Sequence, residues 1–459
     1  MALVNIDNAN GSGHGGGDKL GISVFSGGTA ANSLVDVFNK IAEKSQRKLN
    51  YIIPISDNGG SSSELIRFVG GPSVGDIRSR LVRLIPNHDG DQERSALKLL
   101  FEHRLDSDPL KARAEWLDIV ESQSLLWGFI SSPKRELIRS VLNTVNLEIV
   151  KRARPPNVYN FAGASIGNMF LTGARIFSGS FESAIYLLSM VCSIPPWVDV
   201  LPAINSNFTH HISAGLKDGS TIAGQVAISH PSEPTAVPDD TEVAPALTAA
   251  DHDRIEDANL PGSLPALRRP NIAFSKDEEE DLPARIERLW YINPYGHEIS
   301  PVANPKVVEA LAATSTVIYS IGSLYTSIIP SLILRKVGQA IGGPQIRHKI
   351  LILNSKLDRE TGPRTDPMTA RDFIAAIARA CVESRSPQLV GSDEILGRYV
   401  SHLIYLEGEG TPLVEVEELK RLGIRCIKVK GKPSGTGRRA MIKYDEAALG
   451  KALEAIIDS

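Results

Sequence analysis

From Leu20 to Leu84 the sequence alternates short apolar runs with amphipathic segments, and this alternation constrains the fold more than any other feature. The runs LGISVFS and LNYIIPIS have the length of buried strands, and each is followed by a small-residue turn and a helical repeat. Strands that alternate with helices in this way form parallel sheets covered by helices. The sequence therefore predicts an α/β fold, with a mostly parallel sheet and helices on both faces.

Two longer segments interrupt this pattern, and the first residues of the chain lie outside it. Residues 89–154 show helical periodicity, which predicts a helical insertion. Residues 230–284 are rich in Pro, Asp and Glu, and residues 1–18 are rich in Gly, Asn and Ser; both compositions predict disorder. A regulatory docking role for the acidic segment stays open. We expect a single domain over residues 19–459 that carries one helical and one disordered acidic insertion.

A second α/β stretch begins at Arg285. Its expected strands are RIERLWYI, STVIYSI and HKILILN, and its expected helices are NPKVVEALAA and SIIPSLILRKVGQAI. Before this stretch, Asp218-Gly219 has the turn chemistry of a β-hairpin. The tail GIRCIKVK followed by DEAALGKALEAII predicts a closing strand and helix.

Composition excludes several classes of partner. The formal net charge of −3 offers no basic field, so nucleic acid is not an expected partner. Three widely separated cysteines indicate a reducing, cytoplasmic setting. The uncharged run Thr316–Leu334 approaches the length of a membrane span, but Gly322, Pro330 and several serines interrupt it. We interpret it as a strand, a turn and a helix and expect no membrane partner; a homodimer stays open.

The first expected ligand-binding turn is Ser26-Gly27-Gly28-Thr29, which joins a predicted strand to a predicted helix. Residues without side chains let backbone N–H groups approach phosphate oxygens, and a helix N-terminus adds a favourable dipole. The chain contains no G-x-x-x-x-G-K-[ST] motif and no G-x-G-x-x-G at this turn. A plain strand-to-helix turn is the alternative interpretation.

The second turn carries carboxylates. Asp57 follows a predicted strand and precedes Gly59-Gly60, and Asp76 and Arg78 stand at the start of a predicted helix beside Gly75. Two acids near one sheet edge could hold Mg²⁺ for phosphate chemistry. Alternatively, Asp76 is only a helix-capping acid, and the run after Asp57 is a solvated turn.

Two further turns offer neutral donors. Asn168 lies near a helix start in GASIGNMFL, where small residues could equally serve close helix packing. The segment from Gly322 to Pro330 provides hydroxyl groups at a strand-to-helix turn. Hydroxyls and helix amides can bind a diphosphate without a lysine, which predicts a neutral cradle rich in backbone donors.

Taken in order, these motifs resemble the family of 2-phospho-L-lactate transferase (CofD-like), which includes the YvcK-type gluconeogenesis and cell-shape factors. The matching segments span Leu20 to Val382 and include SGGTA, SDNGGSS, VGDIR, IGNM, ANP and GSLYTSIIP. The spelling of the last segment is closer to the YvcK-type branch.

The resemblance implies a Rossmann-like fold whose glycine turns hold a nucleotide. In the transferase branch, the enzyme moves a phospholactyl group from a nucleotide-activated donor to a deazaflavin hydroxyl, with Mg²⁺; in the regulatory branch the ligand is a UDP-sugar. By position, Asp57 and Asp76 would be catalytic, and Asp57 would also contact the metal. The implied nucleotide- and phosphate-binding residues are Ser26, Gly27, Gly28, Thr29, Gly75, Arg78, Asn168, Asn304, Gly322, Ser323, Leu324, Tyr325, Thr326, Ser327 and Asn354.

Departures from the family pattern keep two functions open. Ser26 and Ala30 replace glycines of the first turn, and Asn58 replaces the second acid of the usual pair. Loss of a carboxylate lowers metal affinity. We therefore expect a transferase that uses a nucleotide-linked donor, with a non-catalytic UDP-sugar sensor as the alternative. An NAD(P)-dependent oxidoreductase is disfavoured by the missing dinucleotide fingerprint.

Overall fold

The computed structural model describes residues 20–57, 59–86, 90–154, 157–229, 263–264, 267, 281–385, 395–434 and 441–459. Residues 1–18 and most of 230–284, both expected to be disordered, lie outside this part of the chain. The division into one domain with two insertions stays a prediction.

The central feature of the fold is a seven-stranded parallel sheet with strand order β11-β10-β9-β8-β1-β2-β3. Every residue of β1 and β2 is buried, as expected for strands covered on both faces. The predicted α/β fold with a mostly parallel sheet is confirmed. The strands are β1 (Gly21–Phe25), β2 (Leu49–Ile53), β3 (Val198–Pro202), β8 (Thr314–Tyr319), β9 (His348–Ile352), β10 (His402–Tyr405) and β11 (Arg425–Lys428).

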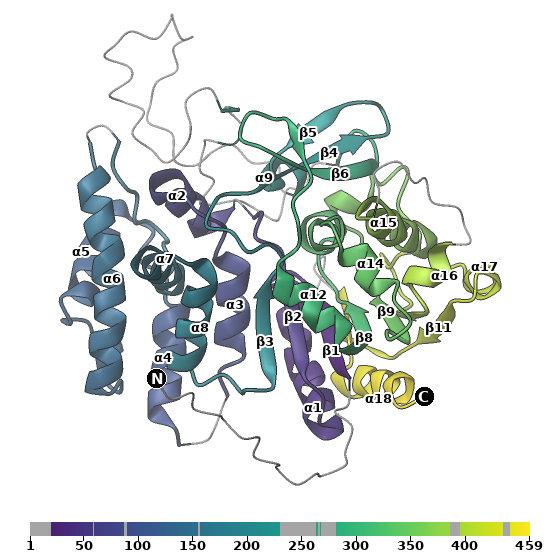
Figure 1. Ribbon diagram of the computed structural model, residues 1–459, viewed down its shortest axis with the longest axis horizontal. Coiled ribbons are helices and arrows are strands. Elements are labelled where there is room, and N and C mark those ends of the chain that lie inside the picture. Colours follow the sequence, from purple (N-terminus) through teal and green to yellow (C-terminus); the bar gives the residue numbers. More distant parts are fainter. Residues whose placement is uncertain are drawn as a thin grey trace, which may run out of the picture.

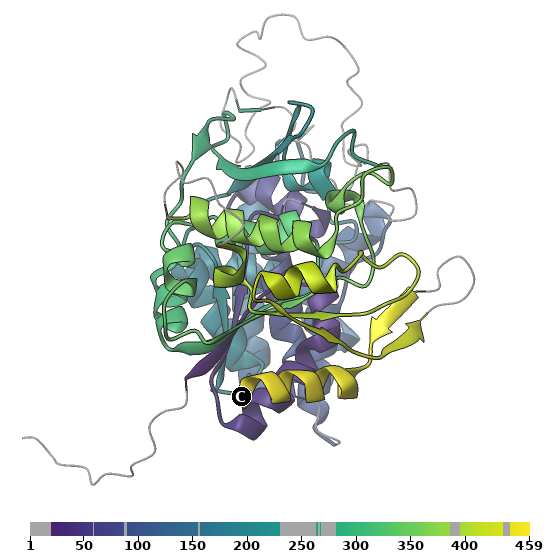
Figure 2. The same cartoon turned by 90° about the vertical axis from the view of Figure 1, so that its right-hand side faces the viewer.

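Helices surround this sheet (Figure 1). In Figure 2 the C-terminal helix α18 lies beside α1, and the Lys44–Glu454 ion pair joins the two at 2.8 Å. In the described residues, apart from the insertion and residues 324–341, the helices are α1 (Val35–Ser45), α2 (Gly60–Val69), α3 (Gly75–Arg83), α7 (Ile166–Ser178), α8 (Phe181–Val191), α9 (Gln225–Ser229), α12 (Pro305–Ala312), α15 (Ala370–Glu383), α16 (Leu396–Tyr399), α17 (Val416–Arg421) and α18 (Glu446–Ile457), with short 3₁₀ turns η1 (Ala30–Leu34) and η4 (Arg359–Thr361).

The segment expected to be a helical insertion is helical. It contains α4 (Gln92–Glu102), α5 (Pro109–Val120), the 3₁₀ turn η2 (Leu125–Trp127) and α6 (Ser132–Arg152). Figure 1 shows these helices to the left of β3, where α6 and α4 pack against α7. The described part of the chain contains no helix long and apolar enough to span a membrane.

Two expectations about the second α/β stretch are wrong. The run from Arg285 forms β6 (Ile286–Ile292), but β6 pairs antiparallel with β4 (His211–Leu216) and β7 (Glu298–Ile299), and β4 pairs with β5 (Thr221–Ala223) in the expected hairpin. The segment SIIPSLILRKVGQAI is broken into the end of a π-helical turn η3 (Leu324–Ile328), α13 (Ile329–Leu332) and α14 (Val337–Ile341). Pro330 fits only a first helical turn, and Lys336 has a left-handed backbone with φ of 81°.

The antiparallel sheet lies over the segment that follows the carboxyl end of β8. Tyr325 Oη donates to the Ile286 carbonyl at 3.0 Å, and Tyr291 Oη donates to the Pro330 carbonyl at 3.0 Å. These bonds fix η3 and α13 beneath β6, at the top of Figure 1. A separate pair, β12 (Gly431–Ser434) and β13 (Met441–Tyr444), projects from the side of the molecule in Figure 2.

Candidate functional site

The order of the strands marks one crevice of the sheet. From β1 the chain adds β2 and β3 on one side, and later adds β8 to β11 on the other, starting next to β1. In open α/β sheets, ligands bind at the carboxyl ends of the strands where the strand order reverses. We refer to the region between the carboxyl ends of β1 and β8 as the switch-point crevice.

The first predicted turn lies at this crevice. Other segments approach its backbone so closely that a side chain at Gly27 or Gly28 would not fit. A Cβ atom at Gly27 would lie 2.5 Å from Ser327 Oγ, and one at Gly28 would lie 2.3 Å from Asp76 Oδ1. The Gly28 N–H donates to the Asp76 carboxylate. The two glycines therefore bring together the turn after β1, the start of α3 and the turn η3, which were separate motifs in the sequence.

A buried arginine lies beneath the first turn. Arg80 is fully buried and donates from Nη2 to Ser26 Oγ at 3.2 Å and to the Gly27 carbonyl at 3.0 Å, and it lies over the Tyr51 ring. Within the described residues no carboxylate forms an ion pair with Arg80. The sequence predicted a neutral cradle, whereas Arg80 gives this turn a positive charge. Ser26 thus contacts Arg80, whereas Thr29 is exposed.

Asp57 and Asp76 are brought together at the same edge. Burial, followed by the nearby Asp76, raises the pKa of Asp57 to about 7, while a bond from the Gly59 amide at 2.9 Å opposes the shift. Burial also raises the pKa of Asp76, against the effects of the Gly28 amide and of Arg80. The raised pKa values mean that burying these two carboxylates in their charged forms is costly without a proton or a cation.

The donor set fits a magnesium ion only if a ligand completes it. No group of three or more His, Cys, Asp or Glu side chains with metal-binding geometry occurs in the described residues. Mg²⁺ is commonly held by one or two carboxylates together with water and substrate phosphates. Asp57 and Asp76 could provide these carboxylates, and Asn58 lies outside the described residues.

The third predicted turn joins the second one. Asn168 Nδ2 donates to Ser61 Oγ at 2.9 Å, and Asn168 Oδ1 accepts from Arg78 Nε at 3.2 Å. A Cβ atom at Gly75 would lie 3.0 Å from Ser62 Oγ, so α2 and α3 start close together. The structure therefore brings Asn168, Gly75 and Arg78 together beside Asp76.

Arg104 belongs to this group and was missed in the sequence. Its Nη1 donates to the Gly163 carbonyl at 3.2 Å and approaches Ser61 Oγ at 3.5 Å. Burial and then the charge of Arg104 lower the pKa of Arg78 to about 10. No described carboxylate forms an ion pair with either arginine. Two neighbouring cations without such partners favour an anionic ligand.

The fourth predicted turn forms the β8 side of the crevice. Asn354, at the end of β9, accepts from the Gly322 amide at 3.0 Å and donates to the Gly322 carbonyl at 2.8 Å. Gly322 has φ of 138°, a conformation that favours glycine. Ser323 and Ser327 are partly exposed, whereas Leu324 is buried and packs in the core.

A buried carboxylate already occupies donors of this turn. Glu360 accepts from the amides of Tyr325 at 2.9 Å and Thr326 at 3.0 Å, and from Thr326 Oγ1 at 2.5 Å. Burial, with a contribution from Asp358, raises the pKa of Glu360 to about 8. The donors of Tyr325 and Thr326 are therefore already used by Glu360. They are not available for the phosphate contacts that the sequence predicted.

Asn304 is not brought to the switch-point crevice. Its Oδ1 accepts from the Lys306 amide at 3.1 Å and its Nδ2 donates to the Pro202 carbonyl at 3.1 Å, so it caps α12 at the end of β3. It is buried. An Asn before a Pro that starts a helix is a common N-cap, and this local signal explains the position of Asn304.

Comparison with known proteins agrees with this geometry. The family described as "2-phospho-L-lactate transferase CofD" matches residues 22–430, which is most of the chain. The chain belongs to the CofD family. The resemblance found in the motifs is confirmed.

The proteins similar to this chain carry two kinds of name. The chain is 39% identical over 435 residues to "Uncharacterized protein YNL011C" of Saccharomyces cerevisiae, covering 89% of this chain and 95% of that protein. It is 21% identical over 413 residues to "Gluconeogenesis factor" of Bacillus subtilis, covering 90% and 91%. A crystal structure of a Bacillus halodurans protein described as a member of the upf0052 family has the same fold, with a TM-score of 0.56 at 19% identity over 95% of this chain and 99% of that one.

Proposed function

We propose that the protein is a cytoplasmic transferase of the CofD type, which moves a phospho-linked group from a nucleotide-activated donor bound in the switch-point crevice. The observation that carries this proposal is the position of Asp76. It contacts Gly28, raises the pKa of Asp57 and lies beside Arg78. Carboxylates with perturbed pKa values beside unpaired arginines are typical of sites that process anionic substrates.

The chain offers three groups to the phosphates of a donor. The amides after Gly28 lie at the start of η1, Arg80 adds positive charge from beneath the turn, and Arg78 and Arg104 lie on the α2 and α7 side. Ser323 and Ser327 add hydroxyls from the β8 side. Guanidinium groups bind phosphate with two donors at once, so this arrangement orients a diphosphate across the crevice.

Asp57 and Asp76 act on the hydroxyl group of the acceptor. The acceptor hydroxyl oxygen attacks phosphorus, its O–P bond forms, the P–O bond to the nucleoside monophosphate breaks, and the hydroxyl proton passes to the Asp57–Asp76 pair. A pKa near 7 suits a general base at neutral pH. When bound beside these carboxylates, Mg²⁺ would neutralise the charge that develops on the leaving phosphate.

A non-catalytic regulator that binds a UDP-sugar is the second candidate. Relatives with 21% to 24% identity are named gluconeogenesis factors. Glu360 supports this alternative, because it removes two backbone donors of η3 from a transferred phosphate. Such a regulator has to bind the UDP-sugar but does not have to convert it.

Calorimetric titration of the purified chain with GDP, GTP, UDP-glucose and UDP-N-acetylglucosamine, with and without Mg²⁺, tests binding. Phosphorus NMR with a guanosine-diphosphate-linked lactate donor and a deazaflavin acceptor then tests turnover. The proposal expects release of GMP, lost in Asp57→Asn and Asp76→Asn but retained in Asp118→Asn, an exposed acid of α5. UDP-sugar binding without any turnover supports the regulator, and absence of binding by all nucleotides contradicts both candidates.

A further inference from the structure

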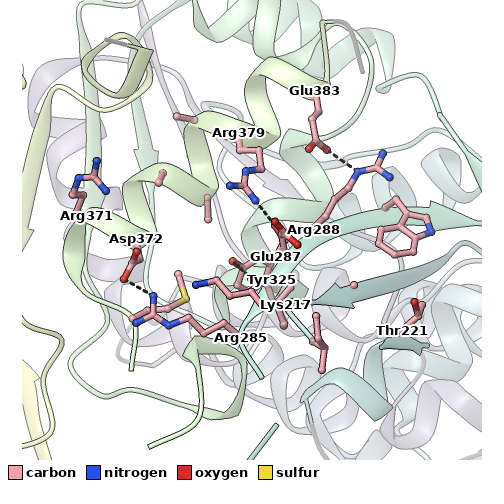
Figure 3. Close-up of a pocket in the computed structure, with 18 of the residues that line it drawn as sticks. Lys217, Thr221, Arg285, Glu287, Arg288, Tyr325, Arg371, Asp372, Arg379 and Glu383 are labelled. Atoms are coloured by element: carbon pink, nitrogen blue, oxygen red, sulfur yellow. Dashed lines mark hydrogen bonds and ion pairs between the residues drawn. The ribbon is translucent and has the colours of Figure 1, made fainter. Parts of the chain in front are cut away.

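A cavity lies away from the glycine turns. It has a volume of about 730 Å³ and is bounded by the β4–β5 hairpin, β6 and α15 (Figure 3). Of the residues assigned to the switch-point crevice, Tyr325 alone lines it. We call it the β6–α15 cleft.

Most of the arginines that line the cleft are neutralised within the protein. Arg285 pairs with Asp366 at 2.6 Å and with Asp372 at 2.9 Å. Arg288 pairs with Glu298 at 2.6 Å, and Glu383 adds a longer contact at 3.4 Å. Arg371 pairs with Glu418 at 2.8 Å. These pairs fix the walls of the cleft and match the three guanidinium groups with five carboxylates, so none of the three arginines is left for a ligand.

Two cations of the cleft have no such carboxylate among the described residues. Lys217 extends from the β4–β5 hairpin, and Arg379 extends from α15 and uses Nη1 on the Glu287 carbonyl at 2.6 Å. Figure 3 shows both side chains directed toward the space beside Tyr325. The Glu287 carboxylate is the remaining lining acid outside these pairs, so recognition of an anion in this cleft depends on the positions of Lys217 and Arg379 and not on an excess of positive charge.

The rest of the lining is apolar. Trp290 and Met368 face the cleft, and small side chains at Ala375 and Ala376 leave room along α15. An apolar wall with a few convergent polar groups is the usual composition of a small-molecule site. The surface suits an organic body rather than an inorganic ion alone.

We propose that the β6–α15 cleft binds a small organic anion, whose phosphate or carboxylate group is held by Lys217 and Arg379 and whose apolar body packs on Trp290. The site is separate from the switch-point crevice and does not depend on the proposed function. The two regions share Tyr325, whose amide is held by Glu360 and whose neighbour Ser327 contacts the first turn. An occupant of the cleft therefore lies against the same short turn that forms one wall of the crevice.

Titration of the full-length chain with phenyl phosphate, phenylacetate, inorganic phosphate and neutral benzyl alcohol tests the proposal, with tryptophan fluorescence and calorimetry as readouts. We expect saturable binding of at least one of the two aromatic anions, and the two probes distinguish phosphate from carboxylate. Lys217→Ala/Arg379→Ala should weaken binding about tenfold or more, since the double variant removes both charged hydrogen-bond donors to the anionic group. Trp290→Phe should remove the fluorescence change while calorimetric binding persists.

The controls separate this site from the crevice. Lys40→Ala/Arg113→Ala removes two exposed cations of α1 and α5 and should bind as the wild type does. Asp76→Asn should also leave phenyl phosphate binding unchanged, whatever it does to nucleotides. Equal binding by the Lys217/Arg379 variant, equal binding of benzyl alcohol, or no saturable binding of either aromatic anion would overturn the proposal.

Discussion

Two turns form the walls of the switch-point crevice, and they differ in what their donors contact. At the β1 turn, Gly27 and Gly28 bring the backbone against Asp76 and Ser327, and a buried arginine lies beneath. At the β8 turn, a buried carboxylate, Glu360, accepts the bonds that a ligand phosphate could otherwise accept. Both turns thus place a buried carboxyl group on backbone amides, Asp76 at the β1 turn and Glu360 at the β8 turn, but the β1 turn also has a buried arginine beneath it.

This difference indicates that the two walls of the crevice have different roles. An internal carboxylate that fills a set of amide donors fixes the shape of the β8 turn before any ligand arrives, and preorganisation lowers the cost of binding. Affinity for phosphate then depends on the β1 wall and its arginines. Substitutions in the β1 wall should change binding more than stability, and substitutions at Glu360 should do the reverse.

The largest expected effect is that of Gly28→Ala. The new Cβ would lie 2.3 Å from Asp76 Oδ1 and 2.9 Å from Asp76 Cα, so the start of α3 must move. Overpacking of this kind costs about 1–3 kcal/mol. Because the displaced start of α3 carries Asp76 and Arg78, nucleotide affinity should fall about 10- to 100-fold, a loss of about 1.4–2.8 kcal/mol of binding free energy. Calorimetric titration with the nucleotide that the wild type binds measures this loss.

Gly450→Ala is the matched control. It lies in α18, and the nearest atom to a new Cβ is 3.8 Å away. Replacing a helical glycine in this setting should raise stability by about 0.5–1 kcal/mol and leave binding unchanged. If Gly28→Ala bound nucleotide as well as Gly450→Ala does, the β1 turn would not be a ligand-binding wall.

Glu360→Ala should have the next largest effect, and it should act on stability. It leaves the amides of Tyr325 and Thr326 buried without partners, and each such loss costs about 1–3 kcal/mol. The melting temperature should fall by about 3–6 °C, measured by calorimetry. An unchanged melting temperature would show that the β8 turn does not depend on this carboxylate.

Glu360→Gln separates charge from hydrogen bonding. Burial raises the pKa of Glu360 to about 8, so the folded protein binds a proton more tightly than the unfolded chain does. Wild-type stability must therefore decline, relative to the Gln variant, as pH rises from about 4.5 through about 8. A difference in melting temperature that stayed constant from pH 5 to pH 9 would contradict this assignment.

Asp57→Asn should show the same sign over a lower range of pH. The pKa of Asp57 is raised to about 7, so its deprotonation opposes folding between about pH 4 and pH 7. The variant should gain about 1–3 °C on the wild type over this range while losing Mg²⁺-dependent nucleotide binding. Thermal scans at pH 5 and pH 8 with and without Mg²⁺ test both parts, and a gain at pH 5 equal to that at pH 8 would argue against the raised pKa.

The sequence predicted the fold where the signal was local. The apolar runs of β1, β2, β8 and β9 and the turn at Asp218-Gly219 were confirmed because strand length and turn chemistry are read within a few residues. The pairing of β6 was wrong, because an apolar run of seven residues does not reveal which strand will be its neighbour. The broken helix after Ser327 reflects Pro330 and the backbone at Lys336.

Residues of the candidate site were likewise predictable where the signal was local. Strand ends and helix starts can be predicted from the sequence, and this led to Gly27, Gly28, Asp57 and Asp76. Glu360 could not be found, since 34 residues separate it from Thr326 and no motif links them. Arg80 had one weak signal, its position four residues after Asp76 on one helix.

The smallest expected effect is that of Arg104→Ala, which tests whether the electropositive wall extends beyond the β1 turn. Arg104 is exposed and forms two long bonds, so its loss should change stability by less than about 0.5 kcal/mol. If it contacts a donor phosphate, nucleotide affinity should fall about three- to tenfold, and more at low salt, because exposed charges are screened. Arg113→Ala, an exposed arginine of α5, is the control. Titration at two salt concentrations distinguishes the two outcomes. Equal affinity for both variants would confine the anion-binding wall to Arg78, Arg80 and the β1 turn, whereas a selective, salt-dependent loss would extend the wall to Arg104.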